Sequence, residues 1–231
     1  MKTSLLTVAL LLVASLTCVP AMAIDATSFS DPTAWNVGDT NSTYNEWDLF
    51  TVSSGNTPDV GTNYGSPTVD VTYPGYPSGS FNFYSHASDY AAFAVVDTPS
   101  VVGKGTRVKV QTASTVGMVG ALMSGLSIFD DSDNLLSDTP YSELELFFGT
   151  VSSSYGPVTQ KESAYSFWLP GYTGNIKLSW TNPIHSSFMG LRVDTLATSQ
   201  DPTAVPEPST AGLLLLGFAG LGFTALRRRK R

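Results

Sequence analysis

The chain has 231 residues, of which only 13% are charged, and its 12 Lys and Arg stand against 19 Asp and Glu for a formal net charge of −7 at pH 7. Between the leader and the tail described below, six basic residues stand against 18 acidic ones, a net charge near −12. Nucleic acids and anionic membrane surfaces are bound through clustered Lys and Arg, so this composition disfavours both as partners of the central region.

The beginning of the chain predicts a secretory signal peptide over residues 1–23. A short positive region precedes an apolar core, and Ala21 and Ala23 supply the two small side chains of a cleavage site. We therefore expect passage through the secretory translocon and cleavage by signal peptidase before Ile24. The single cysteine, Cys18, lies in this leader, so the mature chain is expected to form neither a disulfide nor a thiolate metal site.

Residues 24–196 predict one all-β domain. Short runs of β-branched and aromatic residues alternate with turns rich in Gly, Pro, Asn, Asp and Ser at intervals of about 8 to 12 residues, the spacing of sandwiches and barrels. No strand–helix–strand alternation is present, so we expect an antiparallel, jelly-roll-like β-sandwich. The expected strands cover residues 44–52, 68–72, 80–84, 90–96, 106–112, 117–129, 141–148, 163–169, 175–180 and 188–196.

Alternating side chains predict that each strand has one buried and one solvated face. Val108 and Val110 alternate with Arg107 and Lys109, and leucine and phenylalanine alternate with glutamate over residues 141–148. The apolar members of each run are expected to face the core.

The segment 55–79 contains four prolines and predicts a long ordered loop or an edge region, because proline cannot donate to a sheet ladder. Tyr64, Tyr73 and Tyr76 lie in it and are expected to expose their rings. Exposed rings can stack on sugars, which makes these tyrosines candidate glycan contacts and a carbohydrate-binding module an alternative function. Packing in the core is the simpler interpretation for the four tryptophans.

Two pairs of residues could carry catalytic chemistry. His86 and His185 are the only histidines, and no hydrolase or metalloprotease motif surrounds them, which favours ordinary surface residues. Glu143 and Glu145 share one strand face, and retaining glycosidases use two carboxylates about 5 to 5.5 Å apart. Only leucine and phenylalanine interleave with these glutamates, so a solvated face is the preferred interpretation and a glycoside-active enzyme the weaker alternative.

The cluster Asp130, Asp131 and Asp133 offers oxygen ligands for Ca²⁺. The positions where an EF-hand loop requires Gly and Glu hold other residues, and the cluster lies between two expected strands. A hairpin turn is therefore preferred to a metal site. We expect no cofactor and no enzymatic activity.

A short polar linker over residues 197–204 leads to a membrane-directed tail over residues 205–231. Its residues 210–226 are 17 in number and uncharged, about 25 Å as a helix, the short end of a transmembrane span. A basic cluster follows and is expected to stay on the cytoplasmic side, so that the domain lies outside. An ordinary single-span anchor is the alternative. The cluster comprises Arg227, Arg228, Arg229, Lys230 and Arg231.

The tail resembles the PEP-CTERM sorting signal of Gram-negative envelope proteins. The residues that carry the resemblance are Val205, Pro206, Glu207, Pro208, Ser209 and Thr210, followed by the apolar segment and the basic cluster. The resemblance implies transient anchoring in the inner membrane, processing by an exosortase near residues 206–208, and release or transfer to the cell surface. It also implies an association with exopolysaccharide and biofilm. Residues 41–50 resemble a block of other PEP-CTERM proteins with β-sandwich domains, which implies a fold and no activity.

Overall fold

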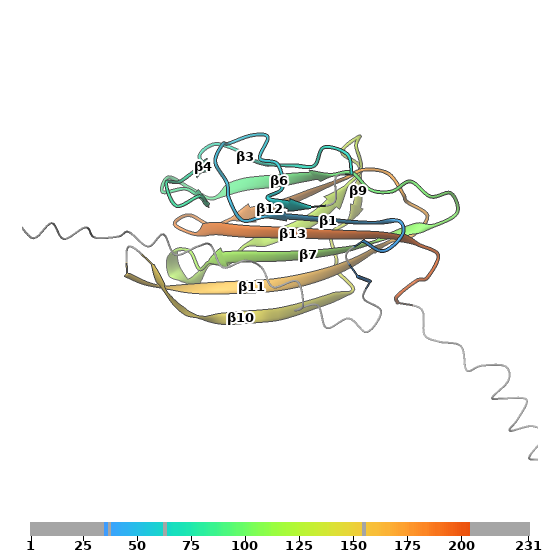
Figure 1. Cartoon of the computed structure of the whole chain (residues 1–231). Helices are drawn as coiled ribbons and strands as arrows, with labels where there is room; N and C mark the ends of the chain where they lie inside the picture. The colour runs from blue at the N-terminus through green and yellow to red at the C-terminus, as the bar shows by residue number, and fades with distance from the viewer. Residues whose placement is uncertain (1–34, 37, 62–63, 154–155, 204–231) are drawn as a thin grey trace, which may run out of the picture.

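Two antiparallel sheets make up the fold (Figure 1). The computed structural model describes residues 35–36, 38–61, 64–153 and 156–203. The larger sheet has the order β10-β11-β7-β13-β1-β2, with β5 pairing to β13 and β4 to β5. Its strands are β1 (Ser42–Trp47), β2 (Val60–Gly61), β4 (Tyr76–Pro77), β5 (Phe83–Tyr84), β7 (Gly105–Thr115), β10 (Ser142–Ser153), β11 (Gly156–Leu169) and β13 (Ser187–Thr198).

The smaller sheet has the order β3-β6-β12-β8-β9. Its strands are β3 (Thr68–Val71), β6 (Tyr90–Val96), β8 (Ser124–Phe129), β9 (Leu135–Ser137) and β12 (Ile176–Asn182). The prediction of an all-β, antiparallel fold is therefore confirmed. The segment 55–79 contains only the short strands β2, β3 and β4, and β3 is an edge strand, as its prolines predicted.

The core is one continuous cluster of buried apolar side chains contributed by both sheets. Trp47 on β1 is fully buried and donates its indole N–H to the carbonyl of Asn56 at 3.0 Å. From the smaller sheet, the Trp180 ring lies 4.9 Å from that of Phe188, centroid to centroid. The interpretation of these two tryptophans as core residues is confirmed, and their rings tie the two sheets together.

Two expected strands are shorter than predicted, each for a local reason. The strand beginning at residue 44 ends at Trp47, because the backbone N–H groups of Asp48 and Leu49 donate to the Asp59 carboxylate instead of to a ladder. The expected strand over 117–129 is interrupted by a 3₁₀ turn, η2 (Met118–Gly120), in which Val119 has a φ of 54°. A left-handed residue cannot continue a strand, so β8 begins only at Ser124.

The predicted division into one buried and one solvated face is wrong for two strands. All residues of β7 are buried, and Arg107 and Lys109 are each only 2% exposed, because β7 is a central strand whose outer face is also covered. Trp35 contributes to that cover, with its ring centroid 4.9 Å from the Lys109 ammonium. On β10 apolar side chains that were expected to face the core are instead exposed. Leu144 is 38% and Phe148 55% exposed, since β10 is the edge strand of the larger sheet.

Candidate functional site

The residues predicted to direct export lie outside the described residues. They are the cleavage residues near Ile24, the sorting motif that begins at Val205, and the basic cluster of the tail. Within residues 35–203, so far as these are described, no helix is long and apolar enough to span a bilayer. The sites that the geometry can address therefore belong to the β domain.

The acidic cluster forms the turn between β8 and β9. The Asp130 carboxylate accepts hydrogen bonds from the Asn134 side chain and from the backbone N–H groups of Asn134 and Ser132, the latter two at 2.8 Å. These hydrogen bonds, that of the Asn134 side chain first, lower the pKa of Asp130. Asp133 forms an ion pair with Lys177 at 2.8 Å. Donors of the turn thus occupy the Asp130 carboxylate and Lys177 of β12 pairs with Asp133, and no group of three or more metal-binding side chains is found among the described residues.

Glu143 and Glu145 lie on the exposed edge strand β10, opposite Tyr165 and Ser163 of β11. Both glutamates are exposed, and so is Leu144 between them. A register shift follows directly after Glu145. This arrangement matches the predicted solvated face for the glutamates and does not enclose the pair in a cleft.

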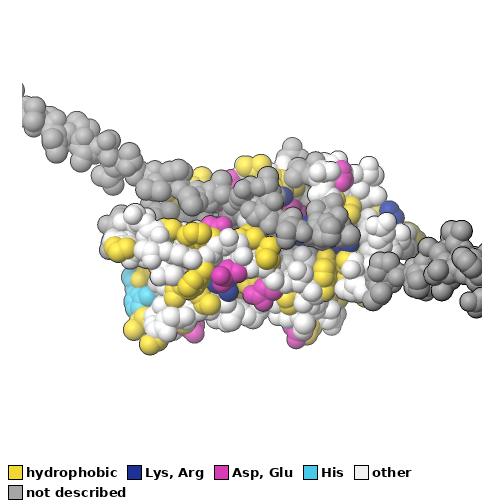
Figure 2. All heavy atoms as spheres, turned by 90° about the horizontal axis from the view of Figure 1, so that it is seen from below, with side chains coloured by type: hydrophobic (Ala, Val, Ile, Leu, Met, Phe, Trp, Pro, Cys, Tyr) yellow, Lys and Arg dark blue, Asp and Glu magenta, His cyan; other side chains and the backbone are white. Residues whose placement is uncertain are grey.

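The structure brings both histidines of the chain to one place, where they contact two tyrosines. Tyr84 on β5 is the centre: its ring centroid lies 6.2 Å from that of Tyr76, 5.6 Å from that of His86 and 6.1 Å from that of His185. The Tyr84 hydroxyl is 2.8 Å from Nδ1 of His185, and the Tyr76 hydroxyl is 3.3 Å from both ring nitrogens of His86. We refer to these four residues as the aromatic–histidine cluster. The histidines are exposed, and Figure 2 shows them in cyan beside hydrophobic side chains at one end of the molecule.

Strand pairing explains why these rings meet. Tyr76 lies directly opposite Tyr84 across the β4–β5 pair, and β5 in turn pairs with the start of β13. His185 occupies the turn before β13 with a φ of 61°, and its N–H donates to the carbonyl of Ser85 at 2.9 Å. Tyr84 and His185 are 101 residues apart in the sequence, so the local pattern that predicted two separate surface histidines could not show their proximity.

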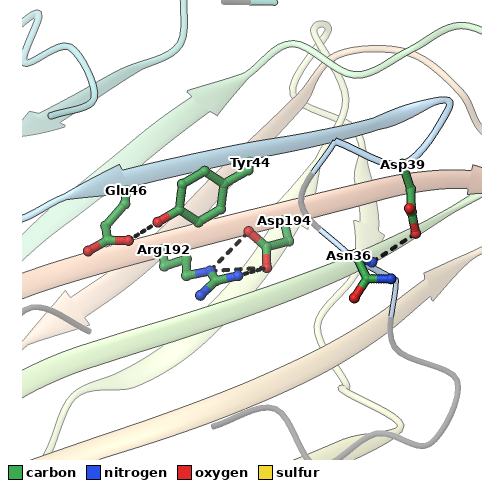
Figure 3. A network of polar contacts seen from close by, with 6 residues as sticks. All are labelled: Asn36, Asp39, Tyr44, Glu46, Arg192 and Asp194. Carbon is green, nitrogen blue, oxygen red and sulfur yellow. Dashed lines mark hydrogen bonds and ion pairs between the residues drawn. The ribbon is translucent and has the colours of Figure 1, made fainter. Parts of the chain in front are cut away.

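A second polar group occupies the outer face of the larger sheet, where β1 pairs with β13 (Figure 3). Arg192 and Asp194 form an ion pair, with Nη2 to Oδ2 at 2.7 Å, and their side chains are 4% and 8% exposed. The Tyr44 hydroxyl donates to the Glu46 carboxylate, and the Arg192 guanidinium lies 4.6 Å from the centre of the Tyr44 ring. Asp48 lies close enough to Glu46 for the charges of the two carboxyl groups to repel each other.

Burial and like charge set the electrostatics of this network. Burial raises the pKa of Asp194 in spite of the opposing effect of Arg192. Burial and the neighbouring Glu46 raise the pKa of Asp48 to about 7, with a further contribution from Asp59. Asp48 therefore holds a proton at mildly acidic pH.

A carboxyl group protonated near neutral pH is a feature of acid–base sites. Here, however, the Glu46 carboxylate already accepts a hydrogen bond from the Tyr44 hydroxyl. Glu46 is also only 5% exposed. The network is therefore suited to holding β1 against β13. No sequence pattern indicates this network beyond the i, i+2 spacing of Glu46 and Asp48.

Comparison with known proteins concerns the tail and the fold separately. No curated protein sequence matches the chain. The crystal structure of the bacteriophage CBA120 tailspike protein 4 enzymatically active domain aligns with 69% of this chain at 12% identity and a TM-score of 0.27, and the chain spans 20% of that protein's length. A TM-score this low supports no conclusion about a shared fold or function. The model of the PEP-CTERM protein-sorting motif, in contrast, matches residues 204–230. The chain therefore carries a PEP-CTERM sorting motif, which is a signal for exosortase processing and export to the cell envelope or surface.

Proposed function

We propose that the chain is a non-catalytic component of the cell surface or extracellular matrix that associates with exopolysaccharide. In this proposal the signal peptide starts export, the apolar tail holds the chain briefly in the inner membrane, and an exosortase then acts near residues 206–208. The observation that carries the proposal is the PEP-CTERM motif at residues 204–230. The net charge near −12 between leader and tail supports a role away from nucleic acid and anionic lipid.

We also propose that the domain is a jelly roll. The order β1-β13-β7-β11 in the larger sheet over β6-β12-β8-β9 in the smaller one supports this assignment, because first and last strands become neighbours as in a rolled-up antiparallel ribbon. Jelly rolls include lectin domains as well as structural ones. The exposure of Glu143 and Glu145 on an edge strand supports a non-catalytic domain.

The test is fractionation of cells that express the natural chain or its Glu207→Ala variant. We expect the natural chain to be shortened and to leave the inner membrane, whereas the variant remains there at full mass. Asp201→Ala is the matched control, because it removes an exposed carboxylate just upstream of the motif. Equal mass and equal membrane retention of the natural chain and Glu207→Ala would contradict the proposal.

A further inference from the structure

We infer that the aromatic–histidine cluster is a binding site for a neutral, single-chain polysaccharide. The inference rests on the proposed function for placing such a ligand in contact with the exported domain. It adds a site, formed by Tyr76, Tyr84, His86 and His185, and a chemical class of ligand.

The chemistry of the cluster matches both surfaces of a sugar. Aromatic rings offer apolar faces that pack on the C–H faces of pyranose rings, while tyrosine hydroxyls and imidazole nitrogens at the ring edges donate to and accept from sugar hydroxyls. The hydroxyls of Tyr76 and Tyr84 already contact imidazole nitrogens at 3.3 Å and 2.8 Å, so these polar atoms lie together at the ring edges. A neighbouring sugar hydroxyl could join the same hydrogen-bonded group.

Charge narrows the ligand to a neutral glycan. None of the four side chains is acidic, and none is Lys or Arg, so the cluster offers no permanent cation to an anionic polymer. The excess of acidic residues between leader and tail repels uronate or sulfate chains as well. A neutral hexose polymer avoids this repulsion.

The orientation of the rings further limits which form of neutral glycan can bind. Tyr76 and Tyr84 cross at 82°, Tyr84 and His86 at 75°, and Tyr84 and His185 at 50°. Rings at such angles cannot form the coplanar platform that a flat crystalline glycan surface would need. They also fill the space between them by direct contact, so a ligand meets their outer faces. The arrangement therefore fits one or two sugar units of a flexible chain.

The cluster is held in place before any ligand arrives. The Ile184 N–H donates to the Asp89 carboxylate at 2.8 Å, and the adjacent His185 N–H donates to Ser85, so two hydrogen bonds fix the turn to the loop after β5. Beneath the cluster, the buried Tyr90 hydroxyl donates to the carbonyl of Phe83 on β5 at 2.9 Å. Preorganised rings lose little conformational entropy on binding, which favours recognition of a weakly interacting ligand.

The experiment is affinity electrophoresis of the purified full chain in detergent through gels that contain galactomannan, xyloglucan or dextran. We expect retardation by at least one of these soluble neutral polymers and none by alginate. Tyr76→Ala and His86→Ala should each raise the Kd about tenfold, the loss of about 1.4 kcal/mol expected for one stacked ring. Phe148→Ala, which removes an exposed aromatic ring on β10 outside the cluster, should leave the Kd unchanged.

Folding and sorting are controlled separately. The unfolding temperatures of Tyr76→Ala and His86→Ala should stay near that of the natural chain, and Tyr84→Phe, which keeps the ring and loses only the hydroxyl, should weaken binding less than either. Absence of retardation by all three neutral polymers, or an equal loss in Phe148→Ala, would overturn the inference. Glu207→Ala is expected to bind as the natural chain does, so a failure of sorting and a failure of glycan binding are told apart.

Discussion

The raised pKa of Asp48 makes the stability of the domain depend on pH in a direction opposite to that of most surface carboxylates. The pKa of Asp48 rises from 3.8 to about 7, so between these values the folded state binds a proton that the unfolded state has lost. The free energy of unfolding must then fall as the pH rises from about 4 to about 7. Asp48→Asn removes the titration and keeps the shape of the side chain.

The expected size follows from the shift. Three pKa units correspond to about 4 kcal/mol at 1.36 kcal/mol per unit. Asp48 is only partly buried, and screening by solvent reduces this to about 2 kcal/mol. Because the raised pKa of Asp194 acts equally in both proteins, the difference between the natural chain and the variant isolates Asp48.

The assay is urea unfolding of both chains at intervals between pH 4.5 and pH 8.5. The natural chain should lose about 2 kcal/mol across this range relative to Asp48→Asn, whose stability should be flatter. Asp138→Asn, which removes an exposed carboxyl after β9, serves as the control and should follow the natural chain. Parallel curves for the natural chain and Asp48→Asn would refute the raised pKa of Asp48.

Three further predictions concern stability, each measured by urea unfolding at constant pH. Arg192→Met should cost about 3 to 5 kcal/mol because it leaves Asp194 buried without its cation, and the added change Asp194→Leu should recover most of that loss; equal stability of the single and double variants would contradict this. Val119→Asn should stabilise the domain by about 1 kcal/mol, since a β-branched residue at a φ of 54° is strained and its fully exposed side chain makes little contact; a loss would show that Val119 has an unrecognised contact. Phe188→Ala should cost about 3 to 5 kcal/mol and Phe148→Ala less than about 0.5, a contrast that similar losses would disprove.

The sequence predicts features formed by neighbouring residues better than features formed by contacts between distant segments. The sequence locates the strand over residues 90–96 to the residue, because it is a continuous apolar run bounded by Asp89 and Asp97. The burial of Arg107 on β7 was not predictable, since alternation separates two faces without showing what covers the second. The sorting motif was recognisable because it is contiguous, whereas the aromatic–histidine cluster depends on the pairing of β5 with β13.

The place of β13 in the larger sheet determines when the domain can finish folding. This strand lies between β1 and β7, which precede it by many residues, so the sheet stays divided until the residues up to Thr198 are free to pair. The sorting motif begins at residue 204, and five intervening residues extend at most about 18 Å. In the export route proposed above, closure of the sheet therefore coincides with arrival of the motif at the membrane. An exosortase that meets the motif meets a domain that has only just become able to fold.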